Sequence, residues 1–171
     1  EKVFIFDAGH GAGRNAIMQG VPIGRTQAVF ITHFHSDHVG GLGSLYYTTW
    51  VTGSRKHPFE VYGPKGVEKV VDGFRLVYEQ DFKYRFAHHG PDVLAEEGME
   101  INAHPFDVPD PSVLAEVFDD GEFKISTFRV DHSPVDPAVG YRIEYPNKVV
   151  VLTGDTMYKD YLKDACKDAD V

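Results

Sequence analysis

The sequence predicts an α+β fold in which helices cover β-sheets. Short β-branched and aromatic runs bounded by turn residues dominate the middle of the chain, and helical patterns lie at its flanks. The length of 171 residues and the hydrophobic fraction of 42% suffice for one domain with its own core. No run approaches the roughly 20 apolar residues that a membrane span needs.

The first elements follow one another closely. Val3–Phe6 reads as a buried strand that ends in the turn Asp7-Ala8-Gly9. A short helix over 14–19 and a strand over 28–32 come next. Apolar residues at three- and four-residue spacing then predict a helix over 40–52.

The rest of the chain alternates between strands and helices. We expect strands at 59–62, 99–103, 115–118, 123–130, 139–145 and 148–153, and helices at 67–78 and 158–168. Asp119-Asp120-Gly121 is typical of a hairpin turn between the third and fourth of these strands. The stretch 81–90 is irregular, and it places His88 and His89 before a turn. These two histidines either touch a substrate or lie in an ordinary surface turn.

One stretch carries most of the chemistry. Directly after the strand over 28–32, three histidines and an aspartate fall within six positions: His33, His35, Asp37 and His38. Imidazole nitrogen and carboxylate oxygen are ligands that zinc prefers. On an extended backbone His33 and His35 point the same way, whereas a turn can aim Asp37 and His38 at a second point. One short loop can therefore serve two metal ions.

This H-x-H-x-D-H motif resembles the one that defines the metallo-β-lactamase superfamily. The resemblance implies a four-layer αββα sandwich with its metal site at one edge of two facing sheets. It also implies that Asp7, in a D-x-G turn, orients the histidine loop through hydrogen bonds. The family's first hairpin and last histidine ligand have no counterpart here. We therefore expect residues 1–171 to be a single domain that lacks its terminal parts, including one ligand of the second metal.

Two later residues complete the expected ligand set. The resemblance implies that His33, His35 and His132 bind one metal, and that Asp37, His38 and a bridging Asp155 bind the other. From the residues alone, His132 can also be a β-edge histidine and Asp155 a helix N-cap. Asp131 either supports the neighbouring ligand or faces solvent.

The segments around His132 and Asp155 narrow the family branch. His132-Ser133-Pro134 and Leu152-Thr153-Gly154-Asp155-Thr156 resemble the ribonuclease Z and arylsulfatase-like branch, which cleaves phosphodiester, phosphate or sulfate esters. The net charge of −9 and the short gap between His132 and Asp155 count against transfer RNA as the substrate. We therefore expect a small-molecule ester hydrolase in which a hydroxide held by two metals attacks phosphorus or sulfur, with Asp37 as a catalytic residue.

Several alternatives remain open at this point. They are a ribonuclease Z-type endonuclease that processes tRNA 3′ ends, a β-lactamase or lactonase acting on a carbonyl, an iron redox protein and a binding-only protein. We expect two divalent ions, zinc first and manganese or iron as alternatives. The expected partner is a small-molecule ester, without a membrane; nucleic acid is disfavoured without being excluded, and a homodimer is left open. The protein is expected to be soluble, either cytoplasmic or exported after cleavage of an upstream signal.

Overall fold

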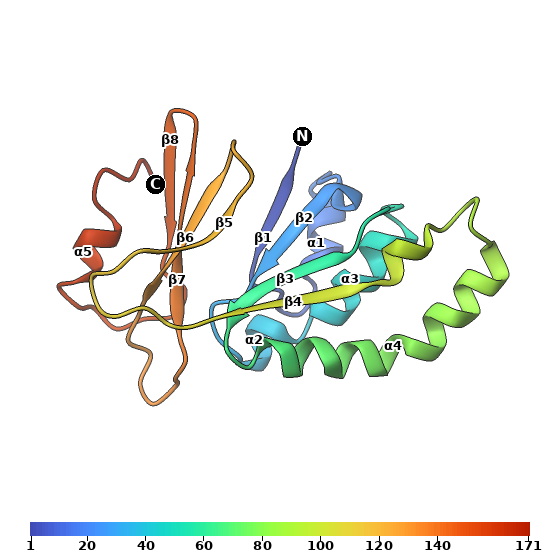
Figure 1. The fold of residues 1–171 in the computed structure, drawn as a ribbon, viewed down its shortest axis with the longest axis horizontal. Helices are drawn as coiled ribbons and strands as arrows, with labels where there is room; N and C mark the ends of the chain where they lie inside the picture. The colour runs from blue at the N-terminus through green and yellow to red at the C-terminus, as the bar shows by residue number, and fades with distance from the viewer. The chain divides into compact units, whose positions relative to one another are not determined.

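The computed structural model describes residues 1–171 and divides them into two compact units. Unit 1 is Glu1–Pro105 and unit 2 is Phe106–Val171. Each unit holds one four-stranded sheet, in the orders β1-β2-β3-β4 and β5-β6-β7-β8 (Figure 1). The α+β class predicted from the sequence is confirmed.

Unit 1 contains four strands, four α-helices and two short 3-10 helices. The strands are β1 (Val3–Phe6), β2 (Thr26–Phe30), β3 (Phe59–Pro64) and β4 (Ile101–Phe106), whose last residue belongs to unit 2. The helices are α1 (Ala12–Met18), α2 (Ser36–Val39), α3 (Leu42–Val51) and α4 (Val67–His89), with 3-10 turns η1 (Ile23–Arg25) and η2 (Glu96–Met99). β2 pairs in parallel with both β1 and β3.

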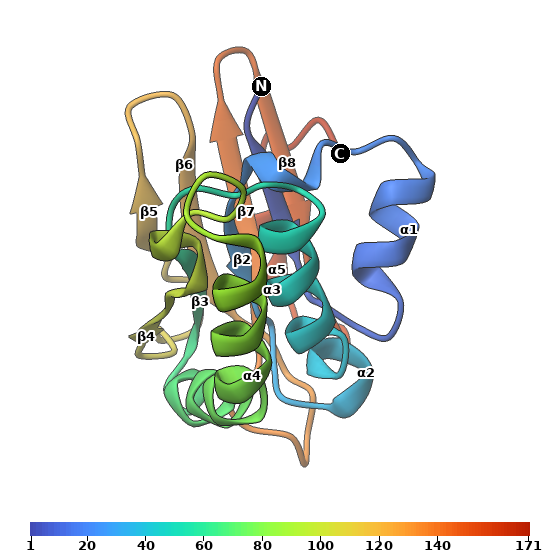
Figure 2. The same ribbon diagram turned by 90° about the vertical axis from the view of Figure 1, so that its right-hand side faces the viewer.

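The core of unit 1 lies between its sheet and two of its helices. Val29, Ile31 and Val61 from the β2 and β3 segments pack with buried side chains of α3 and α4, among them Tyr46 and Phe82. Figure 2 shows α3 and α4 together in front of these strands. This burial explains why the apolar stripes predicted at 40–52 and 67–78 form helices.

A ladder of rings also crosses this sheet, one ring from each strand. Phe6, Phe30, Tyr62 and His104 stack in turn, with ring centroids 5.0, 5.0 and 4.3 Å apart. His104 also pairs with Glu60 at 2.5 Å, which gives this histidine a structural place.

Unit 2 is an antiparallel meander. Its strands are β5 (Ala115–Asp119), β6 (Lys124–Arg129), β7 (Val139–Tyr145) and β8 (Lys148–Leu152), followed by α5 (Leu162–Ala165). Leu162 and Ala165 pack against Phe128 and Val130 in a small core. No helix of either unit combines the length and apolar character needed to cross a membrane.

Three elements differ from the sequence prediction. α4 continues to His89, where an irregular stretch was expected, and ion pairs between Lys83 and Glu79 and between Arg85 and Asp81 lie on this added part. The last helix is one short turn rather than the predicted 158–168. β2 ends at Phe30, so His33 and His35 lie in a loop and not on an extended strand.

Candidate metal centre

The histidine loop follows β2 at the carboxyl edge of the unit 1 sheet. After Phe30 the chain runs through residues 31–35 and enters α2, which carries Asp37 and His38. His33 is only 1% exposed, whereas the Asp37 side chain is 75% exposed. The loop therefore presents one ligand candidate from the core side and another from the solvent side.

Asp7 ties this loop to the end of β1. One carboxylate oxygen accepts a hydrogen bond from the Thr32 backbone N–H at 2.8 Å. The other accepts the Thr32 hydroxyl at 2.8 Å and lies 2.7 Å from Nδ1 of His38. This is the loop-orienting contact that the resemblance implied for Asp7.

The same contacts indicate which nitrogen of each ring carries the hydrogen and which carries the lone pair. The Thr32 hydroxyl has one hydrogen and gives it to Asp7, so His33 Nδ1, 3.0 Å away, must donate its N–H to the hydroxyl oxygen. His38 Nδ1 donates to the Asp7 carboxylate in the same way. Both rings consequently keep the lone pair of Nε2 for a metal.

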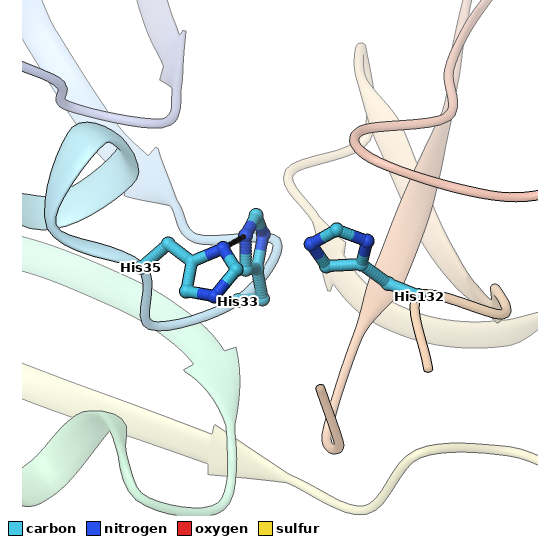
Figure 3. Close-up of side chains that lie close together, drawn as sticks. All are labelled: His33, His35 and His132. Carbon is cyan, nitrogen blue, oxygen red and sulfur yellow. Dashed lines mark hydrogen bonds between the residues drawn. The ribbon is translucent and has the colours of Figure 1, made fainter. Parts of the chain in front are cut away.

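His35 supplies a second nitrogen next to His33. Its Nδ1 lies 3.0 Å from His33 Nε2 (Figure 3). Two ligands at about 2.0–2.1 Å from a tetrahedral zinc ion lie about 3.3 Å apart. A small opening of this pair accommodates such an ion, so the donor set of the loop fits a divalent metal.

Asp37 and His38 form a second pair of donors on α2. Asp37 Oδ2 lies 3.8 Å from His38 Nε2, the nitrogen that does not contact Asp7. An oxygen and a nitrogen donor thus face each other beside the His33–His35 pair. This arrangement suits the prediction that one loop serves two ions.

Glycines allow the loop and the β1 turn to approach closely. A Cβ atom on Gly9 would stand 2.1 Å from the Asp37 carbonyl oxygen, and one on Gly41 would stand 2.0 Å from the Gly9 carbonyl oxygen. The Gly41 N–H donates to the Ala8 carbonyl at 2.7 Å. Neither position has room for a side chain, and the ligand loop depends on both.

Unit 2 brings its two predicted ligands together. His132 follows β6 and Asp155 follows β8, and His132 Nε2 lies 3.7 Å from Asp155 Oδ2. Figure 3 labels His132, which belongs to this unit. The N-cap alternative for Asp155 was wrong, because the last helix begins at Leu162 with Tyr161 as its N-cap.

Asp131 contacts its neighbours rather than facing solvent alone. Its carboxylate accepts bonds from the Ser133 hydroxyl at 2.6 Å and the Ser133 N–H at 3.0 Å, and it pairs with Lys159 at 2.7 Å. These contacts, led by the one from Lys159, hold the pKa of Asp131 well below its usual range. The sequence prediction missed Lys159 and Thr32, because neither belongs to a recognised ligand motif.

The structure does not bring His88 and His89 to the histidine loop. They form the last turn of α4, a helix of 23 residues and therefore about 34 Å in length. The opposite end of α4 lies beside the loop. Its N-cap, Gly66, is so close to Phe34 that an added Cβ atom would stand 3.0 Å from the Phe34 ring. The substrate-binding role expected for these histidines stays a prediction.

Comparisons with known proteins show the family to which the chain is similar. Residues 1–164 match the family described as the metallo-beta-lactamase superfamily. Ribonuclease Z of Mycobacterium marinum is 34% identical over 158 residues, which are 91% of this chain and 53% of that protein. Ribonuclease Z of Mycobacterium bovis is 33% identical over 171 residues, which are 99% of this chain and 58% of that protein. The chain thus spans about half the length of these curated relatives.

Solved structures show the same fold at lower identity. Human tRNase Z, short form, superposes with a TM-score of 0.75 at 23% identity, covering 99% of this chain and 65% of that one. A metallo-beta-lactamase fold protein of Bacillus subtilis superposes with a TM-score of 0.66 at 19% identity, covering 99% and 58%. The predicted fold type is confirmed by these likenesses.

The relatives overturn the expected partner. We expected a small-molecule ester as substrate and disfavoured nucleic acid, and the ribonuclease Z names of the relatives show that this was wrong. The charge argument used the net charge of the whole chain, which does not report the charge beside the histidine loop. Residues 106–171 hold 14 acidic against 7 basic side chains, whereas residues 1–105, with the histidine loop, hold 12 against 10.

Proposed function

This chain belongs to the metallo-beta-lactamase superfamily, and from that premise we propose that it is a ribonuclease Z-type endonuclease that hydrolyses a phosphodiester bond at the 3′ end of tRNA precursors. The observation that carries the proposal is the paired donors of the histidine loop in a chain 33% identical to a ribonuclease Z over 171 residues. The family match runs from residue 1 to residue 164 and crosses both units. We therefore treat residues 1–171 as one domain of this family.

The proposed ligands are those that the family resemblance implies. His33, His35 and His132 would hold one divalent ion, and Asp37, His38 and Asp155 would hold a second. The fixed tautomers of His33 and His38 and the carboxylates of Asp37 and Asp155 are the donors that zinc accepts. When bound, two zinc ions would supply Lewis acidity and lower the pKa of a water molecule.

The chain's own groups orient and move protons. Asp7 holds Thr32 and His38, and so favours the tautomers of His33 and His38 that carry the lone pair on Nε2. Asp37 is the exposed carboxylate of the loop, and we propose that it accepts a proton from the attacking water. The water oxygen forms a bond to phosphorus, the bond from phosphorus to the leaving oxygen breaks, and the leaving oxygen takes up a proton.

The test uses the full-length protein and a precursor tRNA with a 3′ trailer. We expect divalent metal by elemental analysis, cleavage at the trailer, and loss of at least about 100-fold in rate in His35→Ala and Asp155→Ala. His57→Ala is the matched control, since His57 precedes β3 at the end of the sheet opposite the loop, and its Nδ1 lies 2.9 Å from the Pro58 carbonyl oxygen.

Two results would count against the proposal. Turnover of bis(p-nitrophenyl) phosphate without cleavage of the precursor tRNA contradicts the RNA substrate. Unchanged cleavage in His35→Ala contradicts the ligand assignment.

A further inference from the structure

Unit 2 contains a polar contact set that joins the segments of its two proposed ligands. Asp131 precedes His132, and the carboxylate of Asp131 reaches Lys159, four residues beyond Asp155, at 2.7 Å. It also accepts the Ser133 hydroxyl and N–H at 2.6 and 3.0 Å. Three donors from both sides of the ligand pair therefore converge on one side chain.

The backbone repeats this connection. The Met157 N–H donates to the Asp131 carbonyl at 2.7 Å, and the two residues form an isolated antiparallel bridge. The Asp131 N–H donates to the Thr156 hydroxyl at 3.3 Å. This bridge is one residue pair long, so it fixes little on its own, and the side-chain contacts of Asp131 supply the remaining restraint.

We infer that Lys159 is a positioning residue, which acts through Asp131 to hold His132 and Asp155 at the separation that metal binding needs. This inference rests on the proposed function, because it takes His132 and Asp155 as ligands. Groups that orient metal ligands in this way typically change metal affinity 10–100-fold when they are removed.

The other charges near Lys159 do not replace this pair. Arg129 lies 3.8 Å from Asp136 and donates to the Pro109 carbonyl, so its guanidinium is directed to other acceptors. Lys163 pairs with Asp160 at 2.8 Å on the exposed surface. The Lys163 ammonium also lies 5.7 Å from the centroid of the Tyr158 ring. Exposed contacts of this kind contribute little to folding, so Lys163 is a matched control that has no contact with Asp131.

The experiment compares Lys159→Met, Lys159→Arg and Lys163→Met in the full-length protein. The readouts are zinc affinity by chelator competition and the visible spectrum of the cobalt-substituted protein, which reports ligand geometry. We expect about 10-fold weaker zinc binding and an altered spectrum in Lys159→Met. Lys159→Arg should restore both to near wild-type values, and Lys163→Met should match wild type throughout.

Hydrogen exchange of the Met157 amide in metal-free protein gives a second readout. It should be faster in Lys159→Met and in Ser133→Ala. Ser133→Ala replaces Lys159→Met in this measurement if Lys159→Met does not fold. Wild-type zinc affinity and spectrum in Lys159→Met would overturn the inference and leave the proposed function standing. A wild-type protein that binds no metal would instead overturn the proposed function.

Discussion

In unit 1 the ligand loop rests on the core, with His33 1% exposed and held through Thr32 by Asp7. In unit 2 the segments of His132 and Asp155 lie at the ends of an antiparallel meander, and an accessible ion pair joins them. The contact between Thr32 and His33 is buried and cannot exchange for water, whereas the ion pair of Lys159, whose side chain is 43% exposed, can. We therefore expect changes in unit 1 to affect folding and metal binding together, and changes in unit 2 to affect metal binding alone.

The largest expected effect is that of Asp7→Ala. It removes the acceptor of Thr32 and His38, and it places alanine at φ 59°, where asparagine and aspartate are better tolerated. We expect a loss of about 3 kcal/mol in the free energy of unfolding and zinc binding at least about 10-fold weaker. Denaturant unfolding and chelator competition measure the two effects.

Asp7→Asn is the matched control for this change. It keeps the conformation and an acceptor for the Thr32 N–H. The amide nitrogen that replaces Oδ2 can accept neither the Thr32 hydroxyl nor His38 Nδ1. Its free energy of unfolding should lie between those of wild type and Asp7→Ala. Equal stability of all three proteins would contradict the role of Asp7 in holding the loop.

Gly41→Ala should come next. Its methyl group would stand 2.0 Å from the Gly9 carbonyl oxygen, which is backbone and cannot move aside without shifting the loop. We expect a loss of about 2 kcal/mol in the free energy of unfolding. Gly73→Ala, in open space on α4, should instead stabilise the protein by up to about 1 kcal/mol. If both variants unfold at the wild-type denaturant concentration, the close approach is not what holds the loop.

The dependence of stability on alkaline pH tests the burial of Tyr46 in the core of unit 1. Burial raises the pKa of Tyr46 on α3 from 10.0 to about 12. Since the folded pKa is raised, the stabilisation is complete below pH 10 and is lost as pH rises from 10 to 12. At pH 11 we expect the free energy of unfolding to have fallen by about 1.4 kcal/mol more in the wild-type protein than in Tyr46→Phe. Parallel stability curves for the two proteins between pH 9 and 11.5 would contradict this.

The smallest expected effect is that of His132→Ala on the metal-free protein. We expect a change within about 0.5 kcal/mol for His132→Ala and a loss of about 1–2 kcal/mol for the buried His33→Ala. Thermal unfolding in the presence of a chelator measures both. An equal loss in the two variants would show that the two units do not differ as described.

The sequence was informative where the chemistry is local. The donors of the histidine loop fall within six positions, so their grouping is visible without a structure. The pairing of Asp131 with Lys159 joins residues that are 28 positions apart, and no spacing rule links them. The end of α4 was missed because its second half has few buried residues, and helical spacing of apolar residues is the main signal available.

The central claim is that the loop of unit 1 and the two ligand segments of unit 2 serve a pair of metal ions. Anomalous diffraction at the zinc edge, from crystals of the full-length protein grown with zinc, tests it directly. The account predicts two peaks, one bound by His33, His35 and His132 and the other by Asp37, His38 and Asp155. A single peak elsewhere, or no peak at these residues, would contradict it.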